Sequence, residues 1–101
     1  MILYNITTKV HHSIDAAWLE WQREKYIPEI MSTGLFTDFT FSRLLEQDDS
    51  EGNTYAVQFI AANAENYHRY IEIHTTTIRK KAHEKWGSAI ISFHSALEVI
   101  Q

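Results

Sequence analysis

The stretch ILYNITTKVHHSIDAAWLEW, residues 2–21, decides the fold because two hydrophobic periods follow each other in it. Residues 2–10 alternate between two faces, as a β-strand does. From Ile14 onward, apolar side chains recur at steps of three and four, as in an amphipathic helix. Ser13 precedes this run as a helix cap and Asp15 places negative charge in its first turn. The stretch therefore predicts a strand followed directly by a helix.

The same order returns in the second half of the chain. Residues 54–60 alternate again, Asn63 is a good helix cap, and apolar residues then continue at helical spacing to Trp86. Gly34 and Gly87 are placed to end the two helical runs. Further alternating runs follow each glycine, at residues 36–46 and 90–99. This order, βαββαβ, predicts an α+β fold with a four-stranded antiparallel sheet and two helices on one face.

Two irregularities are expected inside the helical runs. Pro28 disfavours the helical conformation at Ile27, which predicts a break or kink there. Thr75, Thr76 and Thr77 are poor interior helix residues, which predicts a bend midway along the second run.

Composition limits the class of protein. The 101 residues suffice for one core, so residues 1–101 are expected to form a single domain. The formal net charge of −4 argues against a nucleic-acid partner. The absence of cysteine excludes disulfides and thiolate metal sites, and no segment is predicted to enter a membrane. A cytoplasmic protein is the expectation.

Each predicted strand has one more apolar face and one mixed face, and we expect the more apolar faces to pack on the helices. In the last strand the more apolar set is Ile91, Phe93, Leu97 and Val99, separated by Ser95. The mixed faces then require another cover that tolerates polar groups. A second copy of the same sheet would supply it, which predicts a homodimer through the open sheet face.

Several local motifs are distributed over nearly the whole chain: Leu3–Thr7, the Trp18/Trp21 pair, Ile27–Gly34, Thr54–Phe59, Tyr70, His74, Trp86–Gly87 and Leu97–Val99. Together they resemble a small uncharacterised bacterial family, a domain of unknown function of about this length. The chain also resembles, mainly in topology, the ferredoxin-like dimeric α+β barrel superfamily. The resemblance implies a ferredoxin-like fold and a dimer, and it supplies no activity to carry over.

Within that superfamily, the haem-degrading and antibiotic-biosynthesis monooxygenases use an asparagine on the first strand with a tryptophan and a histidine on the second helix. Asn5 resembles the first of these. Tyr70 stands near the place of the tryptophan, and His74 and His83 have the wrong spacing. The triad is absent as a motif, so no haem chemistry is inferred and no cofactor is expected.

Candidate site residues come from the aromatic stripes and the polar residues near them. His74 lies between Ile71 and Ile78 on the apolar stripe, either as a core histidine or as an acid or base facing a pocket, with Asn5 as its orienting partner. The candidate ligand-binding residues are Trp21, Arg43, Gln58 and Tyr70, which would contribute to an aromatic-lined cleft. A metal site is not expected, because the His68/Glu72 pair lacks a third ligand.

Two functions therefore remain open from the sequence. In one, a cleft between helices and sheet binds a small organic molecule, with or without catalysis. In the other, the protein is a non-catalytic structural or interaction module whose aromatic residues only fill a core. Cavity volume distinguishes them, because a pocket of several hundred cubic ångströms that reaches both His74 and Asn5 would favour the first.

Overall fold

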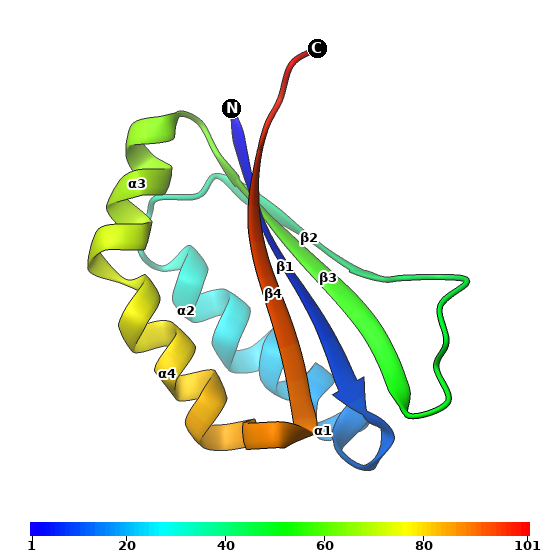
Figure 1. The fold of residues 1–101 in the computed structure, drawn as a ribbon. Coiled ribbons are helices and arrows are strands. Elements are labelled where there is room, and N and C mark those ends of the chain that lie inside the picture. The colour runs from blue at the N-terminus through cyan, green and yellow to red at the C-terminus, as the bar shows by residue number, and fades with distance from the viewer.

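A computed structural model describes residues 1–101 and contains one four-stranded antiparallel sheet with helices on one face (Figure 1). The strands are β1 (Ile2–His11), β2 (Asp38–Arg43), β3 (Gly52–Ala61) and β4 (Ile90–Glu98). Their order in the sheet is β2-β3-β1-β4, and every neighbouring pair is antiparallel. The two chain termini lie at the same end of the sheet, and the β2–β3 loop projects away from the helices. The predicted βαββαβ order and α+β class are confirmed.

The first helical run continues through Pro28 instead of breaking there. It consists of the short 3₁₀ turn η1 (His12–Ile14), α1 (Asp15–Trp21), the π-helical segment η2 (Gln22–Tyr26) and α2 (Ile27–Met31). In η2 the Ile27 N–H donates to the Gln22 carbonyl, five residues earlier. This wider turn precedes a proline that offers no N–H of its own. The expected break is therefore a local π turn within a continuous helical run.

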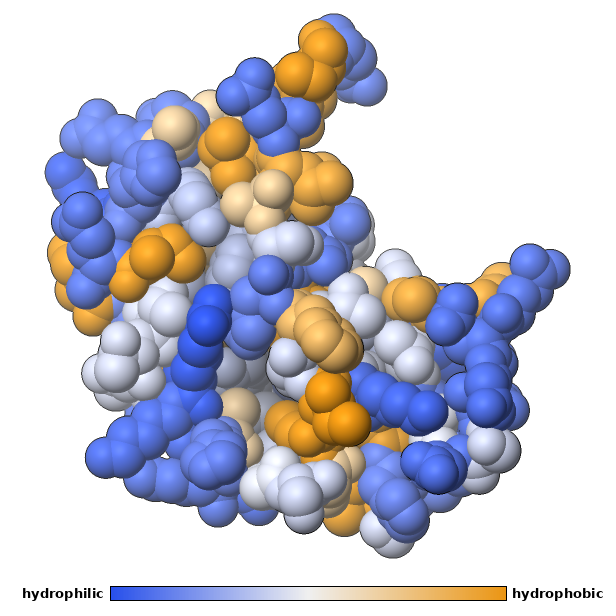
Figure 2. All heavy atoms as spheres, viewed as in Figure 1, coloured by the Kyte–Doolittle hydropathy of each residue, from blue (hydrophilic) through white to orange (hydrophobic).

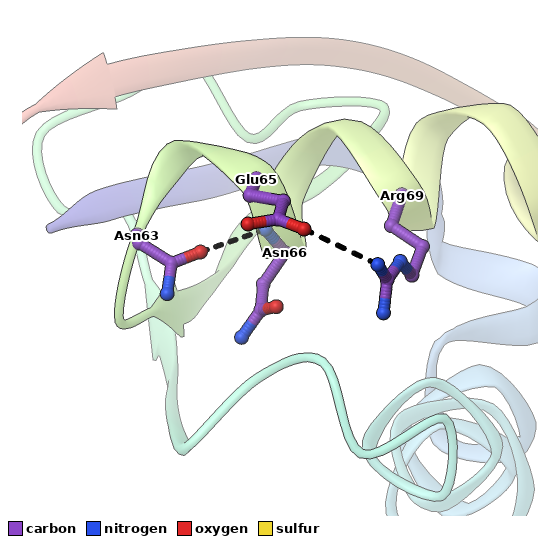
Figure 3. Close-up of polar contacts among 4 residues, drawn as sticks. All are labelled: Asn63, Glu65, Asn66 and Arg69. Atoms are coloured by element: carbon purple, nitrogen blue, oxygen red, sulfur yellow. Dashed lines mark hydrogen bonds and ion pairs between the residues drawn. The ribbon is translucent and has the colours of Figure 1, made fainter.

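The second helical run begins at the predicted cap. Asn63 Oδ1 accepts the backbone N–H of Asn66 at 2.8 Å, and the Glu65 carboxylate pairs with the Arg69 guanidinium at 3.2 Å one turn later (Figure 3). The hydrogen bond to Asn63 satisfies one of the free backbone N–H groups at the start of the helix.

The same run bends where the threonines begin. Helix α3 (Ala64–Ile73) and helix α4 (Thr75–Trp86) meet at His74, whose φ and ψ of −111° and −28° depart from regular helical values. Gly87 then takes φ +54° at the start of the 3₁₀ turn η3 (Gly87–Ala89), a backbone conformation that favours glycine. The predicted bend and the predicted glycine stop are both present.

An aromatic core fills the space between the helices and the sheet. Tyr4 stacks on Phe36 with ring centroids 6.0 Å apart and packs against Tyr70 at 5.5 Å. Towards the other end of the sheet, Trp18 stacks on Tyr55 at 5.2 Å. None of the helices is long and apolar enough to cross a lipid bilayer.

The side chains of strand β4 that face the helices are the opposite set from the one expected from the sequence. Its pairing with β1 sets His94 opposite Ile6 and Ser92 opposite Thr8, on the side of the sheet that faces the helices. Phe93 and Ile91 therefore lie on the open side and are 68% and 57% exposed. The prediction that the more apolar set of β4 packs on the helices is wrong, because the register with β1 fixes which set points inward.

The open face of the sheet consequently combines polar and apolar side chains. Asn5, Thr7 and Gln58 lie near its centre, where Asn5 donates to the Thr7 hydroxyl at 2.9 Å. Hydrophobic side chains reach the surface along β4 and at the C-terminal end, as Figure 2 shows. The exposed large hydrophobic residues on β4 and beyond it are Ile91, Phe93, Leu97 and Ile100.

Candidate functional site

A cleft of about 160 Å³ lies between the two helical runs and the sheet. The first helical run, helix α4, and the strands β1, β3 and β4 all contribute to its wall. The lining residues are Ile6, Thr8, Trp18, Trp21, Gln22, Tyr26, Val57, Phe59, Arg79, Ala82, His83, Gly87, Ile90, Ser92 and His94. This cleft is smaller than the several hundred cubic ångströms considered from the sequence. A dry cavity of about 150 Å³ accommodates one benzene ring, so the space suits a single-ring molecule.

Two buried side chains of the first helical run line the cleft and carry unpaired polar atoms. Trp18 and Gln22 are four residues apart and only 1% and 5% exposed, yet Trp18 Nε1 and Gln22 Oε1 have no hydrogen-bond partner. An unpaired buried donor or acceptor costs about 1–3 kcal/mol. Two residues that line the cleft therefore carry one buried N–H donor and one buried carbonyl acceptor without a partner.

The opposite wall is polar because of the orientation of β4. The Thr8 and Ser92 hydroxyls lie 2.9 Å apart across the β1–β4 pair. The Tyr4 hydroxyl and His94 Nδ1 lie 2.6 Å apart, which occupies one ring nitrogen of His94 and leaves Nε2 available. Each of these pairs joins a β1 residue, whose position is fixed by the core, to a β4 residue that lines the cleft.

Electrostatics keep this wall neutral. Burial, assisted by the nearby Arg79 guanidinium, lowers the pKa of His94 to about 4. Burial also raises the pKa of the Tyr4 hydroxyl. At neutral pH the pair is therefore an uncharged imidazole and an uncharged phenol. Such a pair can donate or accept hydrogen bonds, and His94 takes up a proton only as the pH falls towards 4.

The positive charge of the cleft comes from Arg79 on α4. No aspartate or glutamate lines the cleft, and Arg79 forms no ion pair in the structure. Two lysines of the same helix do form ion pairs, Lys81 with Glu29 at 2.7 Å and Lys80 with Glu84 at 3.7 Å. The cleft is thus an aromatic space with neutral hydrogen-bonding groups and one cation.

Of the residues selected from the sequence, only Trp21 lines this cleft. Asn5 and Gln58 are paired neighbours on the open face of the sheet, which is the other side from the helices. Arg43 is exposed at the end of the edge strand β2. The structure therefore brings Asn5 and Gln58 together, and all three of these residues lie outside the cleft.

The two candidates on the second helical run also lie apart from the cleft. Tyr70 is 1% exposed within the aromatic core and stacks on the His74 ring at 5.9 Å. His74 itself lies at the junction of α3 and α4. The structure therefore does not bring His74 and Asn5 to a common cavity, because the sheet separates the open face from the helical layer.

Sequence reasoning missed Gln22 and the inward orientation of His94. The helical spacing in the sequence indicated a buried stripe of Ile14, Ala17, Trp18, Trp21 and Lys25. The buried row in the structure shares Trp18 with this stripe and continues with Gln22, Tyr26 and Ile30. A polar residue in the middle of an otherwise apolar row with a spacing of four was the available signal. For His94 the available signal was weaker, since the register with β1 depends on the whole sheet.

No group of three or more histidine, cysteine or acidic side chains is placed to hold a metal ion.

The fold belongs to the ferredoxin-like α+β class. Comparison with solved structures supports this assignment. A variant of SnoaB, a cofactor-independent oxygenase from Streptomyces nogalater, matches with TM-score 0.70, 13% identity and coverage of 99% of this chain and 94% of that chain. A Deinococcus radiodurans protein described as an antibiotic biosynthesis monooxygenase matches with TM-score 0.69 and 12% identity, covering 100% and 94%. A dimeric ferredoxin-like protein from an uncultured marine organism matches with TM-score 0.65 and 12% identity, covering 99% and 96%.

The chain belongs to the family described as Domain of unknown function (DUF4286), whose model matches residues 1–100. This agrees with the resemblance seen in the sequence motifs. A comparison with functionally curated proteins gives no significant match. At identities of 12–13%, these structural neighbours establish the fold of the chain and not its function.

Proposed function

We propose that this protein binds a small organic molecule in the cleft between the helices and the sheet, and that it does so as a homodimer. The observation that carries the binding proposal is the pair of unpaired polar atoms, Trp18 Nε1 and Gln22 Oε1, on buried residues that line the cleft. A core built only for stability would pair such groups or replace them with apolar ones. A ligand with an acceptor and a donor would pair both.

The orientation of β4 supports both halves of the proposal. A strand that served only to complete a monomer core would place Phe93 inward and Ser92 outward. Here Ser92 and His94 line the cleft, while Phe93 is exposed on the open face. The polar side of β4 is thus available to a ligand and its apolar side to a second copy. The ferredoxin-like neighbour from a marine organism is described as dimeric, which supports a dimer for this chain.

Thermal denaturation with single-ring probes tests the binding proposal. The probes are phenol, benzamide, benzoate and indole, and each is measured with the wild type and with the Ala82→Leu variant. Ala82 lines the cleft and is half-buried, so a leucine side chain there would occupy part of the 160 Å³. The matched control is Ala64→Leu at the exposed start of α3.

A ligand that binds only the folded state raises its midpoint of unfolding. We expect at least one probe to raise the midpoint of the wild type and of Ala64→Leu, and to leave Ala82→Leu unchanged. Equal shifts in all three proteins would place binding outside the cleft. No shift with any probe would contradict the proposal and favour a structural or interaction module without a ligand.

A further inference from the structure

The chemical class of the ligand can be narrowed from the charges and shapes around the cleft. This inference rests on the proposed function and concerns the same site. It depends on three features: the aromatic walls, the charge of Arg79, and the absence of carboxylates from the lining.

The walls of the cleft suit a flat ring. Trp21 stacks on Tyr26 with ring centroids 4.5 Å apart, and Trp18 lies about one turn before Trp21 on the same helical run. Phe59 of β3 contributes another aromatic side chain to the lining. Aromatic rings favour stacked or edge-on contacts with a further ring, and the volume admits only one.

The charge of the cleft suits an anion. Arg79 lines the cleft without an ion-pair partner, whereas Lys80 and Lys81 on the same helix are each paired with a glutamate. No acidic side chain lines the cleft to repel an anion or to occupy the guanidinium. A guanidinium presents parallel N–H donors that match the two oxygens of a carboxylate.

The neutral polar groups complete the match. Trp18 Nε1 is a donor and Gln22 Oε1 an acceptor, both without a partner on residues that line the cleft, and the His94 ring remains uncharged at neutral pH. These groups would pair a hydroxyl or amino substituent on the ring without adding charge to the site. We propose that the cleft takes a monocyclic aromatic carboxylic acid, with its ring against Trp18 and Trp21 and its carboxylate at Arg79.

Isothermal titration with benzoate and benzamide tests this class directly. The two probes have nearly the same shape and differ in charge. The proteins are the wild type, Arg79→Gln, and Lys80→Gln as a matched control that removes a neighbouring exposed cation outside the cleft. All titrations use one fixed salt concentration, because surface charges are screened by salt.

We expect the wild type and Lys80→Gln to bind benzoate at least about tenfold more tightly than benzamide, since the charged hydrogen bond is the stronger one. Arg79→Gln should bind both probes with equal, benzamide-like affinity. Equal affinity of the wild type for benzoate and benzamide would overturn the proposal of an aromatic acid while leaving a small-molecule site in place. A preference for benzoate that persists in Arg79→Gln would do the same. If neither probe binds the wild type, the aromatic acid is overturned, and the wider probe set with Ala82→Leu then decides the proposed function itself.

Discussion

At the scale of single residues, the fold changes the protonation of His94. Its Nδ1 lies 2.6 Å from the Tyr4 hydroxyl, and burial together with Arg79 lowers its pKa from 6.5 to about 4. Between these two values the unfolded chain binds a proton that the folded chain resists. The folded state is therefore fully favoured above pH 6.5 and loses stability as the pH falls towards 4.

Replacing His94 should remove this part of the acid sensitivity. We expect the free energy of unfolding of the wild type to fall by about 1–2 kcal/mol more than that of His94→Asn between pH 7 and pH 4, after allowance for partial solvent screening. Urea denaturation at both pH values measures the difference. His68→Asn, at an exposed position on α3, should behave as the wild type does. An equal pH dependence in the wild type and His94→Asn would contradict the assigned environment of His94.

At the scale of elements, the start of α3 depends on a single side chain. Asn63 Oδ1 accepts the Asn66 backbone N–H, whereas the Asn66 side chain contributes nothing to that bond (Figure 3). Asn63→Ala should lower the free energy of unfolding by about 1 kcal/mol. Asn66→Ala keeps the backbone donor and should have a smaller effect. Chemical denaturation of both variants compares them, and equal losses would mean that the cap is not what stabilises this helix end.

The sequence predicted these elements well because their signals are local. The Asn63 cap, the bend before Thr75 and the turn at Gly87 each depend on a few neighbouring residues. The continuation of the helix through Pro28 was harder to predict. The helix accommodates the proline by a π-helical segment at Gln22–Tyr26, which lies before the proline in the sequence. The first and last residues of that segment, Gln22 and Tyr26, are buried. The stripe predicted from the sequence passed through Lys25 and did not include them.

At the scale of the whole molecule, the sequence of β4 alone did not predict which of its side chains face the helices and which face the open side of the sheet. Its more apolar set faces out and its polar set faces in, the reverse of what a monomer core would favour. The register with β1 decides this, and register is a property of the complete sheet. The candidate site was missed for the same reason, since Ser92 and His94 enter the cleft only through that orientation.

The exposed apolar side of β4 leads to a prediction about assembly. Phe93→Lys should convert the proposed dimer to a species with the 11.8 kDa mass of one chain, because it places a charge in the proposed interface. Ile73→Lys is the matched control, since Ile73 is 61% exposed on α3 and lies outside the open face. Light scattering should give twice the chain mass for the wild type and for Ile73→Lys. A wild type of single-chain mass would contradict the dimer.

The most direct test of the ligand site observes the indole N–H groups. The chain has three tryptophans, so a ¹H–¹⁵N spectrum has three indole signals, and a Trp18→Phe variant assigns the one from Trp18. The account predicts that benzoate or benzamide moves the Trp18 signal most, because its unpaired Nε1–H gains an acceptor. If the Trp18 signal stays in place at saturating concentrations of both probes, the cleft is not the binding site described here.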